Sequence, residues 1–194
     1  ENQAESNGHR WGKQIFFMGI AILGIGLFWM QKDHYKAYQQ WNKAQMFYNN
    51  KAYEAALEVY EPLYPLLKHK PEFLFEAAQS LSKTGQYEKA NEYLERAVLL
   101  SSDPMLYYVM AKNEQCLGEY RQAEKHLLHA IDILPERIYP YYLLMNLYTE
   151  PSYFQPAKLK MAIDSVLTKK PKVESSAIKE MKEKARSMLN NTSI

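Results

Sequence analysis

The sequence has little cysteine, little glycine and almost no net charge. Its 194 residues include one cysteine, Cys116, which excludes an intramolecular disulfide framework and a cysteine-rich zinc site. Glycine occurs 7 times, and three of these glycines lie between residues 19 and 26, so the rest of the chain favours long helices over many short strands. Its 24 basic and 22 acidic side chains leave no bulk charge that would indicate a nucleic-acid partner.

Long apolar runs are also scarce, and the exception lies near the N-terminus. From Ile15 to Met30 the sequence IFFMGIAILGIGLFWM contains no charged side chain, and basic residues flank it on both sides. As a helix this run rises about 24 Å, and Gln14 and Gln31 extend it toward the roughly 30 Å of a hydrocarbon core. We therefore expect a transmembrane helix over residues 14–31, after a polar flank over residues 1–13.

Two other interpretations of the apolar run are open. A secretory signal peptide is the first, but the residues after Met30 offer no small-residue cleavage site. A buried core helix is the second, and all-round apolarity is against it because a soluble helix normally keeps one polar face. The basic residues on the two sides are too evenly divided to fix the orientation of a span. No glycine or proline separates Met30 from Asn49, which is compatible with one helix that continues into the rest of the chain.

A pattern of about 34 residues recurs four times in the remainder of the chain. The aligned segments begin at Lys51, Gly85, Gly118 and Ser152, at intervals of 34, 33 and 34 residues. Each contains an aromatic residue, an alanine three positions later and a large residue four positions beyond that, which places all three on one helical face. These positions hold Tyr53, Ala56 and Tyr60, then Tyr87, Ala90 and Leu94, then Tyr120, Ala123 and Leu127, and finally Phe154, Ala157 and Met161.

A further predicted helix precedes each of these segments, so that the helices come in pairs. Gly85 and Gly118 fall between the two helices of a pair, where a residue in the left-handed conformation turns the chain. Helix-turn-helix units of this length, with this spacing of alanine and aromatic residues, resemble the tetratricopeptide repeat. The resemblance implies an all-α solenoid of about four helix pairs over residues 32–171. The first pair lacks the turn glycine and carries Pro62 and Pro65, which should kink or shorten its second helix.

The last segment, residues 172–194, is predicted to form a capping helix and tail. Ser175 or Ser176 can cap this helix, and its charged residues can face water, as a terminal repeat requires. The residues expected to face inward are Ala177, Met181, Ala185 and Met188 or Leu189.

The first helix of each pair lines the concave surface in tetratricopeptide proteins, and the resemblance gives this surface a largely aromatic character here. Rigid amphipathic rings suit an extended peptide, a helix or a sugar, although the same rings could pack between repeats. The clamp by which some family members hold an acidic chain terminus is not matched, because Trp41 and Gln45 occupy its positions. We expect this surface to bind a protein or peptide partner, with a glycan as the alternative. The predicted binding residues are Tyr38, Trp41, Gln45, Tyr48, Phe75, Gln79, Lys83, Tyr108, Lys112, Gln115, Tyr139, Tyr142 and Asn146.

No pattern in the sequence indicates catalysis. His126 and His129 could share a metal, but no third ligand stands at a suitable spacing, and exposed helical histidines are the better interpretation. Cys116 is more typical of a small packing residue than of a nucleophile, because no histidine stands at a motif-like distance. We predict no catalytic residue, no metal site and no cofactor within this chain, and no nucleic-acid partner.

The apolar run followed by aromatic-rich repeats also resembles a family of bacterial membrane proteins. The segments EPLYPLLKHKPEFLFEAAQSLSKTGQYEKA, RIYPYYLLMNLY and KKPKVESSAIKEMKEKA resemble the C-terminal region of O-antigen ligase or polymerase-like proteins, particularly those of Bacteroides-type bacteria. The resemblance implies the end of an inner-membrane glycan transferase whose catalytic part is absent from this chain. We therefore predict a non-catalytic, membrane-tethered interaction module in surface polysaccharide assembly, with its repeats in the periplasm. The alternatives are a self-contained membrane-anchored adaptor and repeats that contact glycan during transfer.

Overall fold

The computed structural model describes the backbone of residues 2–171 and 173–191, and the side chains of residues 16–26, 32–171 and 173–190. Every regular element within these residues is helical, which confirms the all-α prediction. The elements are α1 (Asn2–Asn49), α2 (Tyr53–Leu67), α3 (Pro71–Lys83), α4 (Tyr87–Val98), α5 (Pro104–Leu117), α6 (Tyr120–Ile133), α7 (Tyr139–Leu147), the 3₁₀ turn η1 (Pro151–Tyr153), α8 (Pro156–Thr168) and α9 (Ser176–Asn191).

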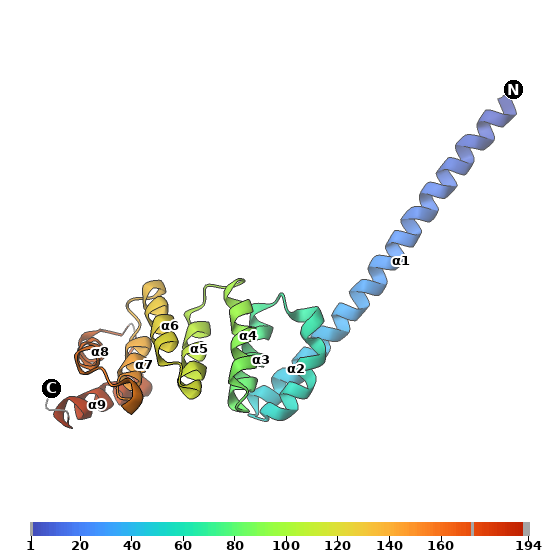
Figure 1. Cartoon of the computed structure of the whole chain (residues 1–194). Coiled ribbons are helices and arrows are strands. Elements are labelled where there is room, and N and C mark those ends of the chain that lie inside the picture. Colours follow the sequence, from blue (N-terminus) through green and yellow to red (C-terminus); the bar gives the residue numbers. More distant parts are fainter. Residues whose placement is uncertain (1, 172, 192–194) are drawn as a thin grey trace.

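The helices pack one after another into a solenoid, from which the N-terminal part of α1 projects as a long free helix (Figure 1). Each helix from α1 to α9 contacts the next one along the chain. The first helices of successive pairs also contact one another, α1 with α3, α3 with α5 and α5 with α7, and α9 continues the series against α7. One side of the solenoid is therefore formed by α1, α3, α5, α7 and α9, and we call this side the concave face.

The membrane span predicted for residues 14–31 is not confirmed. It falls within α1, and among the described residues no helix is long and apolar enough to cross a membrane. The side chains of residues 14, 15 and 27–31 lie outside the described part. The described apolar stretch, Phe16 to Gly26, rises about 16 Å as a helix, roughly half of a hydrocarbon core.

The repeated core positions are confirmed in the first three pairs and wrong in the fourth. Small residues at the predicted contact points are fully buried, and so are the large residues that follow them: Ala56, Ala90, Ala123, Tyr60, Leu94 and Leu127 are all 0% exposed. In α8, however, Met161 is 70% exposed, whereas Leu159 and Ile163 are 1% exposed. The reason is η1, which lengthens the connection, so that Leu159 and Ile163 follow Ala123 and Leu127 by 36 residues (159 − 123 and 163 − 127).

The turns within the pairs follow the prediction and extend it. Gly85 and Gly118 have φ angles of 81° and 78°, in the left-handed region that favours glycine. The corresponding turn of the first pair uses Lys51, with a φ of 60°. A side chain in this conformation is strained, because its Cβ approaches the following carbonyl oxygen.

The prolines of the first pair do not shorten its second helix. Helix α2 continues through both Pro62 and Pro65, so of the two expected outcomes, a kinked or a shortened helix, the shortened helix is wrong. Both prolines are exposed, while Leu63 and Leu67 are buried on the opposite side of the helix. Burial of that apolar side therefore maintains the helix, because most helical stability in proteins comes from packing.

The capping helix forms where predicted, with a change in the residues it buries. The amide of Ile178 donates to Ser175 Oγ at 3.3 Å, so Ser175 caps α9. Ala185 is buried and Met181 and Met188 are half-buried, as expected. Of the alternatives Met188 and Leu189, Met188 is the one that packs. The prediction for Ala177 is wrong, because Ala177 is exposed and Ile178 packs in its place.

The apolar core consists of two clusters that meet on α5. The N-terminal cluster joins α1 to α4 and takes in Leu106 and Met110 of α5. The C-terminal cluster joins α6 to α9 and takes in Tyr108 and Ala111 of the same helix. The solenoid thus has an N-terminal and a C-terminal half, and α5 contributes to both.

Candidate partner-binding surface

All thirteen predicted binding residues lie on α1, α3, α5 and α7, the helices of the concave face. Their surroundings differ between the two halves of the solenoid. Phe75 and Gln115 are half-buried, and Lys83 is exposed at the end of α3. The remaining residues fall into a group on α1 and α3 and a group on α5 and α7.

On α1 and α3 the polar side chains bond to one another across the repeats. Trp41 Nε1 donates to Glu76 Oε2 at 2.7 Å, and Gln45 Nε2 donates to Glu76 Oε1 at 2.8 Å. From α2, the hydroxyl of the fully buried Tyr60 donates to Glu76 Oε2 at 3.1 Å. One carboxylate therefore joins three helices, and we call these four residues the Glu76 network.

The aromatic rings of this group are part of the same packing. Tyr48 donates to Gln79 Oε1, and the ring of Trp41 meets Phe73 edge-to-face with centroids 5.7 Å apart. Burial, with the charge of Glu76 as a second cause, raises the pKa of Tyr48 and Tyr60, so both hydroxyls stay protonated and able to donate. On α1 the structure places Trp41, Gln45 and Tyr48 between repeats, as the alternative interpretation of the rings expects.

On α5 and α7, in contrast to α1 and α3, two buried polar atoms have no hydrogen-bond partner among the described residues. Tyr108 is 4% exposed, and neither its hydroxyl nor Asn146 Oδ1 has a hydrogen-bond partner among the described residues. The Tyr108 ring meets that of Tyr139 edge-to-face, with centroids 5.2 Å apart. Buried polar groups without a partner are uncommon in proteins, and each calls for an explanation.

Three of the described lysines lie over tyrosine rings of α7, and one of them, Lys169 over Tyr141, forms an ion pair with Glu136. Lys112 of α5 places Nζ 5.7 Å from the centroid of Tyr139, and Lys184 of α9 places Nζ 5.4 Å from that of Tyr142. Neither Lys112 nor Lys184 forms an ion pair with a described carboxylate. We call Tyr108, Lys112, Tyr139, Tyr142, Asn146 and Lys184 together the α7 site.

A second carboxylate network lies away from the concave face and was not predicted. Glu124 of α6 accepts from Tyr148 at 2.6 Å, from Tyr153 at 2.8 Å and from Lys158 at 2.7 Å. Burial alone would raise the pKa of Glu124, but these hydrogen bonds outweigh burial and hold the pKa below its ordinary value. This network fastens α8 and η1 to α6.

The residues considered for catalysis or metal binding are two histidines and a cysteine, and the structure places no metal-ligand group around them among the described residues. His126 is half-buried, with Nδ1 2.9 Å from the carboxylate of the buried Glu114, so the expectation of an exposed side chain is wrong for it. His129 is exposed and lies edge-on to Tyr107. Cys116 is exposed and belongs to neither cluster, which corrects its prediction as a packing residue. Among the described residues no group of three potential ligands could hold a metal ion.

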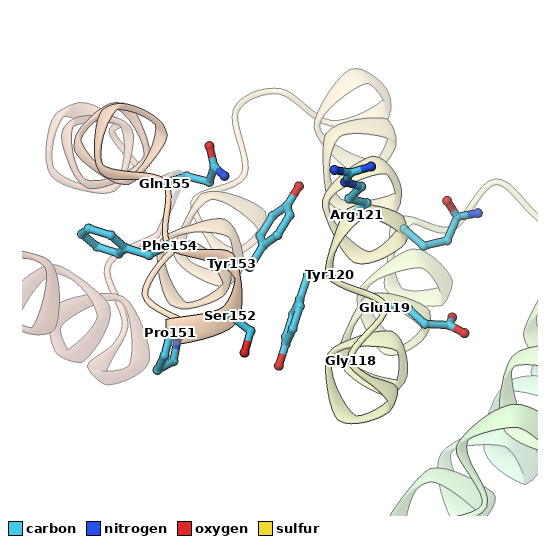
Figure 2. A pocket seen from close by; sticks show the side chains of 10 residues that line it. Gly118, Glu119, Tyr120, Arg121, Pro151, Ser152, Tyr153, Phe154 and Gln155 are labelled. Atoms are coloured by element: carbon cyan, nitrogen blue, oxygen red, sulfur yellow. The ribbon is translucent and has the colours of Figure 1, made fainter.

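An open cleft of about 870 Å³ lies between the first turn of α6 and η1 (Figure 2). The rings of Tyr120 and Tyr153 stack within it, with centroids 5.7 Å and planes 22° apart, and Arg121 extends over its rim. Phe154 points away from these rings and is 50% exposed. None of the thirteen predicted residues lines this cleft, which exists because η1 widens the space between the third and fourth pairs.

Comparison with known proteins supports the repeat architecture. The family model for the anaphase-promoting complex, cyclosome, subunit 3 matches residues 49–130. A MamA structure from Desulfovibrio magneticus RS-1, residues 41 to the end, aligns with a TM-score of 0.62 at 19% identity and covers 82% of this chain and 98% of that one. The chain has a tetratricopeptide-like fold.

Further comparisons agree with this repeat protein's fold. The MamA RS-1 ArsTM double mutant aligns with a TM-score of 0.62 at 20% identity, covering 80% of this chain and 96% of that one. A further MamA crystal structure gives a TM-score of 0.60 at 19% identity, over 74% of this chain and 82% of the other. None of the curated proteins matches in sequence. These matches give no support to the resemblance to O-antigen ligases.

Proposed function

We propose that this tetratricopeptide-like protein is a non-catalytic interaction module that binds an extended segment of a partner protein at the α7 site. The carrying observation is the contrast along the concave face. On α1 and α3 the polar groups are taken up by the Glu76 network, whereas on α5 and α7 two polar atoms and two lysines have no hydrogen-bonding or ionic partner among the described residues. Rings and polar groups together suit a polypeptide, because backbone amides need both donors and acceptors.

A peptide selected from a display library against the whole chain tests this proposal by titration calorimetry. We expect Tyr142→Ala, in the α7 site, to weaken binding of the selected peptide about tenfold or more, as loss of a central aromatic residue does in protein interfaces. Tyr38→Ala is the matched control, since Tyr38 is a 38% exposed tyrosine on α1 outside the Glu76 network. Equal losses in both variants, or failure to select any peptide, would contradict the proposal.

For the location of the module, we propose that a lipid bilayer covers the apolar stretch of α1. Seven large apolar side chains between Phe16 and Ile25 are 51% to 68% exposed and point to all sides of the helix. A helix that is apolar all round requires an apolar environment all round, which a second protein surface on one side does not supply. Flotation of the whole chain with phospholipid vesicles tests this point. Ile22→Asp combined with Ile25→Asp should abolish flotation, and unchanged flotation would exclude the stretch as the lipid contact.

The resemblance to O-antigen ligases supports a more specific proposal, a periplasmic module that assists a glycan ligase or polymerase in the bacterial inner membrane. A self-contained adaptor and a glycan-contacting part of a transferase are the alternatives. The start of the native reading frame separates the first two, because a methionine just upstream of Glu1 would exclude the ligase. A compartment reporter fused after Ile194 tests the periplasmic location, and a cytoplasmic signal would exclude it. Glycan binding that Tyr142→Ala reduces would favour the third.

A further inference from the structure

We propose that the α7 site selects an acidic segment of its partner, whose internal aspartate or glutamate carboxylates pair with Lys112 and Lys184. This inference rests on the proposed function and specifies the chemistry of the bound segment. It differs from recognition of an acidic chain terminus at the first repeat, where Trp41 and Gln45 are already committed to Glu76.

The two lysines approach α7 from opposite sides. Lys112 extends from α5 and Lys184 from α9, and the rings beneath them, Tyr139 and Tyr142, are three residues apart on one helical face. Side chains with this spacing are neighbours on a helix. The two ammonium groups therefore lie on either side of α7, where carboxylates of one bound segment could accept from each of them.

The tyrosine rings position these cations without neutralising them. A cation over a ring is held by the ring quadrupole, but its charge remains. The two other described lysines over tyrosine rings do have ionic partners: Lys158 pairs with Glu124 and Lys169 with Glu136. A carboxylate ligand would give Lys112 and Lys184 the charge-assisted hydrogen bonds that they lack.

The nearby charges favour the same ligand. Burial raises the pKa of Tyr108, and the charge of Arg137 acts on the same hydroxyl in the opposite direction. Asp103 is the acidic residue that influences Tyr108, but its Oδ1 already accepts from the amide of Met105 as the cap of α5. Asp103 forms no ion pair with Lys112 or Lys184.

The unpartnered polar atoms match a peptide backbone beside the carboxylate. Asn146 lies one turn beyond Tyr142 on the same face of α7, and its buried Oδ1 can accept an amide N–H of the ligand once binding exposes it. The Tyr108 hydroxyl is protonated and can donate to a carbonyl or carboxylate oxygen. Its ring packs against Tyr139, so a ligand that draws Lys112 away from Tyr139 would allow that ring to move and expose the hydroxyl.

The test uses the whole chain and two short synthetic peptide pools of otherwise random sequence. One pool contains Asp and Glu, and in the second pool Asn and Gln replace them. We expect the acidic pool to bind about tenfold tighter or more. Lys112→Glu and Lys184→Glu should each weaken binding of the acidic pool by about tenfold and leave the amide pool nearly unchanged.

Lys160→Glu is the matched control, because Lys160 is an exposed lysine of α8 outside the concave face. Lys112→Arg, which keeps the charge, should bind the acidic pool nearly as well as the wild-type chain and shows that the site still folds. If both pools bind equally, the acidic ligand is wrong while the proposed function stands. If neither pool binds, the proposed function fails as well. If Lys160→Glu loses as much affinity as Lys112→Glu, only the overall charge matters and the α7 site is overturned.

Discussion

The two halves of the solenoid have the same architecture but treat the polar groups of the concave face differently. In the N-terminal half, the Glu76 network joins α1, α2 and α3 through hydrogen bonds from Trp41, Gln45 and Tyr60. In the C-terminal half, the hydroxyl of Tyr108 and Oδ1 of Asn146 have no partner among the described residues.

This difference separates stabilising the solenoid from binding a partner. A polar group that already has its hydrogen bonds gains little free energy from a hydrogen bond to a ligand. A buried polar group without a partner gains much more, because the new bond removes the cost of leaving that group unsatisfied. On the concave face, the polar groups of the N-terminal half can therefore be expected to contribute stability, and those of the C-terminal half to contribute recognition. The following predictions test that division.

The largest expected effect concerns the core of the C-terminal half. Ile163→Ala should lower the free energy of unfolding by about 3 kcal/mol, because Ile163 is 1% exposed and its truncation leaves a cavity. Met161→Ala, at the position that the sequence alignment favours, should change it by less than about 0.5 kcal/mol, since Met161 is 70% exposed. Urea denaturation of both variants measures the effects. A larger loss of stability in Met161→Ala than in Ile163→Ala would contradict the structure and would show that the 34-residue spacing also holds in the fourth pair.

The Glu76 network should matter for stability and not for binding. Glu76→Ala removes the acceptor of three donors, including the hydroxyl of the buried Tyr60, and should cost about 2 kcal/mol. Peptide affinity at the α7 site should remain unchanged at a temperature where the variant is folded. Glu72→Ala, an exposed glutamate one turn earlier on α3, is the control and should cost less than about 0.5 kcal/mol. A folded Glu76→Ala chain that no longer binds peptide would show that the N-terminal half takes part in recognition.

Acid should weaken the C-terminal half through Glu124. Its pKa is lowered in the folded chain, so its stabilising contribution is fully present above the ordinary value of 4.5 and is lost as the pH falls through the lowered value. We expect a contribution of about 1 kcal/mol, modest because the side chain of Lys158 is 47% exposed. Chemical denaturation at pH 7 and below pH 4.5 measures the loss, and Glu124→Gln should show less of it. An equal acid loss in that variant would assign the effect to other carboxylates.

The smallest expected effect distinguishes the turns of the two halves. Lys51→Gly should raise the free energy of unfolding by about 0.5 kcal/mol, because it relieves a left-handed residue at the first turn. Gly118→Ala at the third turn should lower it by about 1 kcal/mol, through backbone strain alone, since an added Cβ would meet no atom within 4 Å. Thermal unfolding of both variants is sufficient. A destabilised Lys51→Gly chain would show that the lysine side chain contributes more than its backbone strain costs.

The helix pairs could be predicted because local rules and packing agree along most of the chain. Alanines at positions of close contact and glycines at left-handed turns are fixed by geometry that the spacing reveals. The fourth pair could not be predicted in the same way. A change of two residues in the connection rotates a helix by more than half a turn, so Met161 and Ile163 exchange places while the composition of α8 stays the same.

The candidate site was predictable only as a set of positions. A spacing of 34 residues places Trp41 opposite Phe75 and Gln45 opposite Gln79, but Glu76 lies one position off that face and was missed. The sequence did contain a signal for this network, because the carboxylate of Glu76 lies next to the face that carries the donors of Trp41 and Gln45. No sequence pattern indicated that the Tyr108 hydroxyl and Asn146 Oδ1 would lack hydrogen-bond partners. Whether a buried polar atom has a partner depends on which groups the neighbouring helices place beside it in three dimensions.

The length of α1 has a mechanical consequence. One unbroken helix contains both the exposed apolar stretch and the first layer of the solenoid, with no glycine or proline after Gly26 to act as a joint (Figure 1). Any surface that binds residues 16–26 therefore also fixes the orientation of the concave face, because one continuous helix connects the two. Insertion of two residues between Lys32 and Lys36 would rotate the solenoid by roughly 200° about the axis of α1, relative to residues 16–26, without changing the contacts within the solenoid.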